Sequence, residues 1–232
     1  MATMKYGIIG AGQYGSAIAR ELAAKGAEVY SFDLNHERVE AIKDEVAFAV
    51  SLDSTDKKVL EAQNISSFDA VVVAIGENFE ATILTALNLL DMNIPRVIVR
   101  ASGENQVRIL KNIGVQEILT PEKEVAENIA EMLINPSITA FLQLPDNYEI
   151  AEIKAPKGVA NRTIHDVDLR NKYTLTLITL KRAYEVKGEA DETVIEEHTI
   201  GVPKGDTVIY DTDTLVVFGT LKNIKRFIEI NG

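Results

Sequence analysis

The sequence of 232 residues contains no cysteine. This absence excludes a disulfide framework, thiol-based catalysis and metal sites built from thiolates. Positive charge is also scarce, with 24 Lys and Arg residues against 35 Asp and Glu residues and a net charge of −11. Because nucleic-acid binding depends on clustered cations, the composition argues against a nucleic-acid partner.

Long apolar runs are missing as well. The longest uninterrupted run, residues 70–75, is far shorter than the roughly 20 residues that a membrane span needs. We therefore expect a cytoplasmic protein, which only a partner could hold at a membrane. The length suffices for one large or two modest domains.

A glycine-rich turn, GAGQYG at residues 10–15, stands between a short apolar run at 5–9 and a helical pattern. Gly10 permits a tight turn, Gly12 lets a phosphate approach the backbone, and Gly15 lets the helix pack closely on the strand. Free amide groups at the start of the helix would face the phosphates. The arrangement predicts a dinucleotide-binding unit.

An acidic residue follows the glycines at the spacing that this fingerprint requires. A second β-type run at 28–32 ends in Asp33, about 20 residues past the glycines, where a carboxylate accepts the ribose hydroxyls. A lone GxGxxG is a weak signal. The strand before it, the helix after it and Asp33 together favour nucleotide binding over a loop that is only structural.

Strand and helix signals alternate through about the first 140 residues, which predicts an α/β fold with a Rossmann-like, doubly wound parallel sheet. We expect this domain to cover residues 1–144. The expected strands are residues 5–9, 28–32, 48–50, 68–75, 96–100 and 117–119, with a helix in each connection.

The end of this domain is expected to be a pair of helices. Pro121 suits the first turn of a helix that runs to about residue 133, and a second apolar stretch follows. Terminal helices that leave a sheet often pack on a second copy, so we expect a subunit contact there. Its apolar side chains would be Ile138, Phe141 and Leu142.

A linker at 144–147 and a small α+β domain over residues 145–232 complete the expected organisation. Thr163 would begin a short helix, and 221–230 would form a closing helix. The charged segment 181–198 predicts a hairpin or a mobile loop. The expected strands are residues 149–155, 173–180, 207–210 and 214–218.

Catalytic partners for a bound nucleotide are hard to find in the sequence. A dehydrogenase needs an acid or base beside the nicotinamide, and His36, His165 and His198 are all expected at the surface. The motifs of zinc proteases, serine hydrolases and P-loop proteins are absent from the sequence. This suggests that the nucleotide acts as a signal.

A series of motifs carries a family resemblance over nearly the whole chain. They are GAGQYG at 10–15, FDLN at 32–35, DST at 53–55, VAIGEN at 73–78, VRA at 99–101, TPEK at 120–123 and IHDVDLRNKY at 164–173. In this order they resemble the RCK (regulator of potassium conductance) proteins, the cytosolic regulatory subunits of bacterial Ktr and Trk potassium-uptake systems.

The resemblance implies dimers that assemble into an octameric ring, dock on a membrane potassium channel subunit and change shape as ATP is exchanged for ADP. It also implies a divalent cation held by Glu122 between subunits. Arg100 and Glu122 have plainer interpretations, as a salt-bridging residue and a helix-start carboxylate. The residues implied at the nucleotide are Gly10, Gly12, Gln13, Tyr14, Gly15, Asp33, Leu34, Asn35, Asp53, Ser54, Thr55, Ile75, Gly76, Asn78 and Arg100.

Two features qualify the resemblance. Gln13 stands where many relatives carry an arginine directed at the terminal phosphate, so ATP and ADP should be poorly distinguished and NAD or NADH could compete. Some relatives also bind cyclic di-AMP at the region that corresponds to Ile164, Asp166 and Arg170. His165 replaces the aliphatic residue usual there, which favours a helix that pairs two subunits instead.

The leading hypothesis is a non-enzymatic, nucleotide-gated regulatory subunit of a potassium channel. An NAD-dependent oxidoreductase of small substrates is the rival, since Asp33 would favour NAD over NADP. A purely structural scaffold is a third interpretation.

Overall fold

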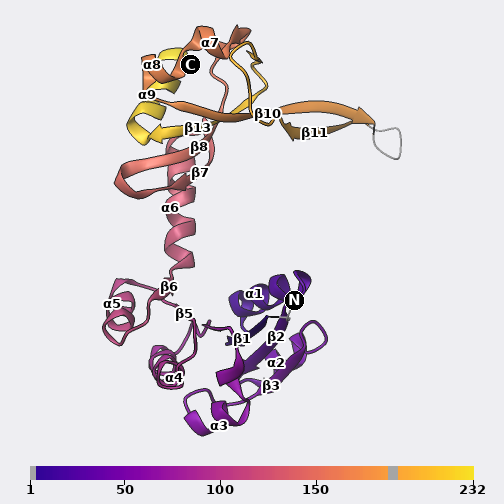
Figure 1. Ribbon diagram of the computed structural model, residues 1–232, viewed down its shortest axis with the longest axis vertical. Coiled ribbons are helices and arrows are strands. Elements are labelled where there is room, and N and C mark those ends of the chain that lie inside the picture. The colour runs from indigo at the N-terminus through magenta and orange to yellow at the C-terminus, as the bar shows by residue number, and fades with distance from the viewer. Residues whose placement is uncertain (1–3, 188–192) are drawn as a thin grey trace. The chain divides into compact units, whose positions relative to one another are not determined.

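The computed structural model describes residues 4–187 and 193–232. Its contacts divide the chain into two compact units, Met1–Val125 and Ala126–Gly232. Figure 1 shows both units as ribbons. Each unit has a hydrophobic core of its own. Among the helices of the described ranges, none has the length and apolar character needed to cross a membrane.

The first unit alternates strands and helices. Its strands are β1 (Lys5–Ile9), β2 (Glu28–Asp33), β3 (Phe48–Ser51), β4 (Ala70–Val73), β5 (Val97–Arg100) and β6 (Glu117–Leu119). Its helices are α1 (Gln13–Ala24), α2 (His36–Ile42), α3 (Lys57–Ala62), a 3-10 turn η1 (Ile65–Ser67), α4 (Phe79–Asp91) and α5 (Glu104–Asn112), and α6 (Pro121–Ile134) crosses the division.

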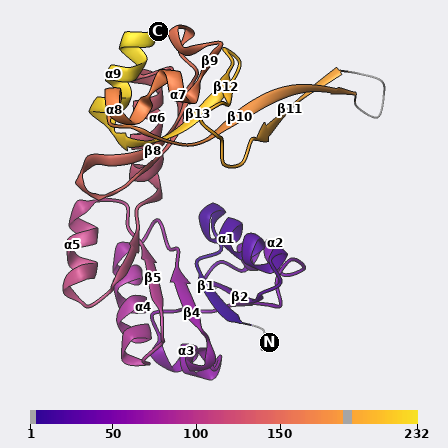
Figure 2. The ribbon, with the colours of Figure 1, turned by 45° about the horizontal axis from the view of Figure 1, so that its top comes forward.

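All strand pairs of this sheet are parallel, in the order β3-β2-β1-β4-β5-β6. Alternate side chains face opposite layers: Ile8 joins a core with α1 and α2, whereas Ile9 joins one with α3, α4 and α5. Figure 2 shows α1 and α2 apart from α4 and α5 across the strands. The Rossmann-like prediction is therefore confirmed, and the strand order reverses between β1 and β4.

Polar caps explain where several helices begin. The side chain of Asn35 accepts hydrogen bonds from the amides of Glu37 and Arg38, as expected from the sequence. Asp56 caps α3 in the same way. The α2 helix ends at Ile42, with Val39 and Ile42 buried.

The second unit is built on an antiparallel sheet in the order β11-β10-β13-β8-β7. The strands β9 and β12 form a separate two-stranded antiparallel sheet. After α6 the elements are β7 (Ile138–Gln143), η2 (Pro145–Asn147), β8 (Tyr148–Lys154), η3 (Lys157–Val159), β9 (Arg162–Thr163), α7 (Ile164–Val167), α8 (Leu169–Tyr173), β10 (Thr176–Lys187), β11 (Thr193–Thr199), β12 (Val208–Ile209), β13 (Thr214–Thr220) and α9 (Leu221–Asn231).

The stretch predicted as the second terminal helix is strand β7, so that prediction is wrong. Its residues pair antiparallel with β8, and the connection at 144–147 is a tight hairpin turn in place of an interdomain linker. Ile138 is 1% exposed in the core of its own unit, and Phe141 packs against that core. Ile138 is therefore not available for the expected subunit contact, whereas Phe141 is partly exposed and Leu142 is exposed.

The segment 181–198 is predicted to be a hairpin or a mobile loop, and its described residues form an antiparallel ribbon of β10 and β11 that extends from the sheet of the second unit (Figures 1 and 2). Residues 188–192 of the segment lie outside the described ranges. At its base, Arg182 donates two hydrogen bonds to the buried carboxylate of Asp213, at 2.8 and 2.7 Å. The same guanidinium lies 4.1 Å from the ring centroid of Tyr210. This ion pair joins β10 to the start of β13.

Candidate nucleotide site

The glycine loop lies where the strand order reverses, at the carboxyl ends of β1 and β4. In open α/β sheets this crevice is where ligands bind. The loop is fixed by backbone hydrogen bonds, from Gly10 to the carbonyl of Phe32 and from Ala74 to the carbonyl of Ile9, both at 2.7 Å. The first turn of α1 carries no acidic side chain, so its amide groups retain their attraction for an anion.

Two of the glycines are required by the backbone. Gly10 has a φ of +99°, and a Cβ there would lie 3.0 Å from the backbone at Ala74 and Ile75. A Cβ on Gly15 would overlap the carbonyl oxygen of Gly10, so only glycine lets α1 pack this closely on the loop. The structure thus supplies the physical reason for the GxGxxG spacing.

The carboxylate of Asp33 ties the end of β2 to the glycine loop. One oxygen accepts a hydrogen bond from the amide of Ala11 at 2.6 Å, and the other accepts one from the amide of Asn35 at 2.8 Å. The residue is 8% exposed. Because a carboxylate offers about four lone-pair positions, it retains capacity for two further donors, as a ribose would supply.

Arg100 reaches across the loop that follows β4. Its guanidinium would lie 2.9 Å from a Cβ on Gly76, and it lies 5.4 Å from the ring centroid of Tyr14. It also donates to the carboxylate of Glu122, at the start of α6. A backbone hydrogen bond and the Arg100 guanidinium hold the pKa of Glu122 below its usual value, and burial raises the pKa of Tyr14. The residues predicted for phosphate and cation therefore contact each other.

Several other predicted residues have local structural roles. The hydroxyl of Ser54 shares a hydrogen bond of 2.8 Å with Thr85 on α4. Asp53 accepts hydrogen bonds from the amide and the hydroxyl of Thr55, which hold its pKa below the usual value. Asn78 caps α4 by accepting from the amide of Ala81. These contacts shape the loops after β3 and β4.

Three further residues predicted for the nucleotide differ in their exposure. Gln13 is exposed at the first position of α1, and Leu34 is 73% exposed directly after Asp33. Ile75 is partly buried against the core of the first unit. A large exposed aliphatic residue beside the ribose acceptor offers an apolar surface for a base.

Arg38 and Glu77 also border the loop, and the sequence reasoning missed both. Nη1 of Arg38 is 3.9 Å from Oδ2 of Asp33, and Nη2 is 3.5 Å from Oε1 of Glu77. One signal was present in the sequence. Arg38 is a cation in the first turn of α2, where the helix dipole favours an anion.

In the second unit, the residues predicted for cyclic di-AMP lie on α7 and α8. Ile164 packs against the core of that unit, and the side chain of His165 is 87% exposed. Asp166 accepts from the hydroxyl of Thr163 at 2.7 Å, which holds its pKa below the usual value. Arg170 is exposed on α8. Asp166 is therefore hydrogen-bonded to the residue that caps α7, and Arg170 is exposed to solvent.

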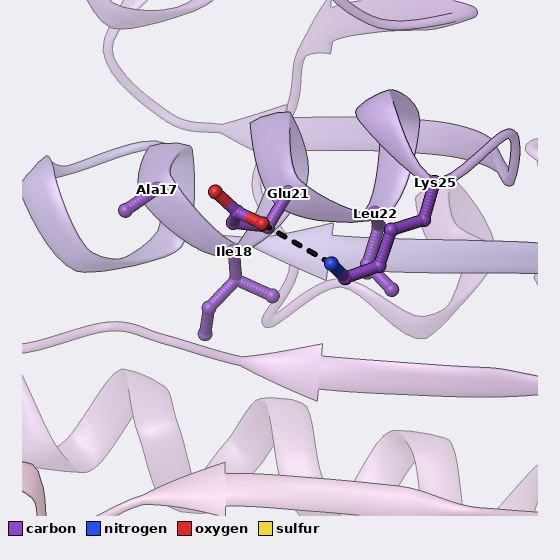
Figure 3. Close-up of a pocket in the computed structure, with 5 residues that line it drawn as sticks. All are labelled: Ala17, Ile18, Glu21, Leu22 and Lys25. Atoms are coloured by element: carbon purple, nitrogen blue, oxygen red, sulfur yellow. Dashed lines mark ion pairs between the residues drawn. The ribbon is translucent and has the colours of Figure 1, made fainter. Parts of the chain in front are cut away.

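A shallow hollow with a cavity volume of about 310 Å³ lies along α1, away from the glycine loop. Figure 3 shows Ile18 and Leu22 on its lining, beside the ion pair between Glu21 and Lys25 at 3.5 Å. Lys25 on its lining is already paired with Glu21, and the other lining residues are apolar, so the hollow does not suit a phosphate. As to metals, within the described ranges no three His, Asp or Glu side chains gather where they could hold an ion.

Comparison with known proteins places these features in a family. The TrkA-N domain pattern matches residues 6–121, which contain the glycine loop, Asp33 and Arg100. The chain belongs to the TrkA-N family. It is 32% identical over 223 residues to Ktr system potassium uptake protein C of Bacillus subtilis, covering 96% of this chain and 95% of the relative. Ktr system potassium uptake protein A of the same organism is 31% identical over equal shares.

Solved structures share the fold of this TrkA-N family member at low sequence identity. The GsuK RCK domain superposes with a TM-score of 0.65 at 16% identity, covering 100% of this chain and 48% of that chain. The GsuK channel bound to NAD gives a TM-score of 0.63 at 16% identity, over 99% of this chain and 39% of that one. The chain thus spans about half the length of these structures or less. Together with the TrkA-N match and the two Ktr relatives, the shared fold confirms the expected resemblance.

Proposed function

We propose that this protein is a nucleotide-binding regulatory subunit of a potassium-uptake system, acting at the inner face of the cell membrane through a channel partner. The supporting observation is similarity along nearly the whole chain to two Ktr potassium uptake proteins, together with an intact glycine loop. The role is regulatory and non-enzymatic in this proposal, because the relatives that match nearly the whole chain are named as potassium uptake proteins.

The proposed ligands are ATP and ADP, with NAD or NADH as competitors. The loop amides and Gly12 would take the phosphates, and Asp33 the ribose hydroxyls, with lone pairs still unused. Leu34 would cover the base. The GsuK channel, whose solved structure shares this fold and is bound to NAD, supports the dinucleotide as an alternative occupant.

Exchange of ATP for ADP would shift the protein between two shapes. Moving a two-state balance from 1:99 to 99:1 takes about 5.5 kcal/mol, and an octameric ring built from dimers could share this among its sites. Arg100 and Glu122 provide a link from the site to α6, since Arg100 at the end of β5 donates a hydrogen bond to Glu122 in the first turn of α6. A phosphate that drew Arg100 away would release Glu122, which could then bind a divalent cation through its oxygens.

For the subunit contact we propose α6, in place of the residues expected from the sequence. Its exposed apolar side chains recur on one side of the helix, and a second copy of this chain would cover them. The charged substitution that tests this is Ile129→Asp, which should lower the oligomer mass in light scattering. These side chains are Val125, Ile129, Met132 and Leu133.

Cyclic di-AMP at α7 and α8 remains a secondary proposal. Exposed Arg170 could pair with a phosphate, whereas Asp166 is engaged with Thr163. Calorimetry with cyclic di-AMP on wild type and Arg170→Gln tests it. A wild type that does not bind leaves this segment as a helix pair between subunits.

Potassium uptake by cells provides the decisive test. Co-expression of this chain with a Ktr channel subunit, in bacteria that lack uptake systems, should increase uptake. The variant Gly10→Val should lose this effect, because its side chain would collide with the backbone at Ala74. Turnover of a hydroxy acid, alcohol or amino acid with NAD would overturn the proposal in favour of an oxidoreductase. Melting temperatures unmoved by any adenine nucleotide would favour a scaffold.

A further inference from the structure

Arg38 lies beside the second glycine of the nucleotide-binding loop. The second glycine of this fingerprint is needed because a pyrophosphate approaches its backbone. Apart from the glycine's own neighbours, the closest atom to a Cβ placed on Gly12 is Nη1 of Arg38, at 3.9 Å. The guanidinium therefore lies beside the stretch of backbone that a phosphate would approach.

The guanidinium is held there by weak contacts. Its two ion pairs, to Asp33 and Glu77, span 3.9 and 3.5 Å, longer than a charge-assisted hydrogen bond of about 2.7–2.9 Å. Asp33 already accepts two backbone hydrogen bonds, and the side chain of Glu77 is 89% exposed. Arg38 thus has donors to offer to a ligand.

The other residues considered for the phosphates are less available. Gln13 is neutral, and Arg100 donates to Glu122. Asp33 places a negative charge near the loop, which would repel an anionic ligand unless a cation compensates. Arg38 is the cation that lies beside both Asp33 and Gly12.

We propose that Arg38 binds a phosphate of the nucleotide and that Glu77 holds the guanidinium over the loop until the ligand replaces it. The inference rests on the proposed nucleotide binding. It adds the residue that makes the site prefer phosphorylated ligands. Glu77 then acts as a competitor of the phosphate. Arg38 gives the site a preference for nucleotides over nucleosides.

Calorimetry with ADP, AMP and adenosine tests the proposal on the full-length protein. Arg38→Gln should weaken ADP and AMP by about tenfold or more, the loss of one charge-assisted hydrogen bond, and adenosine by less than about twofold. Glu77→Gln should strengthen ADP binding. Arg38→Lys should retain part of the affinity, since it keeps the charge without the planar fork.

Arg20→Gln is the matched control, because Arg20 lies on α1 and pairs with Glu45 at 2.6 Å. It removes one positive charge from the same unit and should leave ADP binding unchanged. Circular dichroism should show all variants folded. If Arg38→Gln loses equal affinity for adenosine and ADP, or loses no affinity for ADP, the proposed role of Arg38 is overturned. The proposal that the wild type binds nucleotides would still stand. A wild type that binds no adenine nucleotide would defeat both proposals.

Discussion

The two units use buried charge in opposite ways. In the first, the carboxylate of Asp33 accepts two backbone hydrogen bonds and keeps lone pairs unused at the edge of a crevice. In the second, Asp213 accepts three hydrogen bonds, two from Arg182 and one from the amide of Tyr210. A carboxylate whose partners are complete stabilises a fold, and one with capacity left over can also bind a ligand.

The sharpest way to break this comparison is Asp213→Ala. Arg182 would be left mostly buried without its partner, which costs about 3–5 kcal/mol of unfolding free energy. Affinity for ADP should not change, because the pair lies in the second unit. Urea unfolding and calorimetry measure the two effects, with exposed Asp211→Ala as the control. Loss of ADP binding in a folded Asp213 variant would contradict the separation.

Asp33→Ala should have the opposite profile. Removing the ribose acceptor should weaken ATP, ADP and NAD together by about 1.5–3 kcal/mol, tenfold or more. The amide of Ala11 would also lose its partner, so the loop should become less ordered. Asp33→Asn serves as the comparison in calorimetry, since it keeps an acceptor for that amide. Unchanged affinity in both variants would remove Asp33 from the site.

The same contrast explains what could be predicted from the sequence. The first unit is specified by local signals, since the glycine turn, the buried β-branched run and the helix caps each act within a few residues. The order of its strands, in contrast, is given by pairing between distant segments in the structure. The segment at Ile138 was misassigned because its apolar spacing suits a helix, and pairing with β8 decides otherwise. Tertiary partners override local preference in such short segments.

The candidate site divides in the same manner. The positions of the glycines and Asp33 follow from a fingerprint whose physical reasons are local. The pair of Arg100 with Glu122 joins the end of β5 to the start of α6, and that of Arg38 with Glu77 joins α2 to the segment after β4. Only the folded sheet brings these segments together, so their pairing was out of reach of sequence reasoning.

Glu149 provides a test of buried charge within the second unit. It is 4% exposed, and its Oε2 has no hydrogen-bond partner among the described residues. Burial, followed by the negative charge of Glu131, raises its pKa, while Lys225 acts against this. The folded state therefore favours the protonated form, and this contribution to stability is lost as pH rises through the raised pKa.

Glu149→Gln should raise the unfolding free energy at pH 7.5 by about 1–3 kcal/mol, because a neutral amide replaces an unsatisfied buried carboxylate. The gain should shrink as pH falls through the raised pKa of Glu149 toward the ordinary carboxyl pKa, because the wild-type carboxyl is then protonated in the folded state. Urea titrations at several pH values measure it, and Glu229→Gln on the exposed side of α9 should show no such trend. A destabilised variant at pH 7.5 would mean that the carboxylate has a partner in solution.

The smallest expected effect concerns Gln13 and returns the comparison to the first unit. A neutral amide cannot offset the extra negative charge of ATP, and Arg100 is engaged by Glu122. We therefore expect wild type to bind ATP and ADP within about tenfold, a gap below about 1.4 kcal/mol, with NAD in competition. Gln13→Arg should create a preference for ATP, whereas Gln13→Met should not. A wild-type preference for ATP far above tenfold in calorimetry would mean that Arg38, Arg100 or a divalent cation already reads the terminal phosphate.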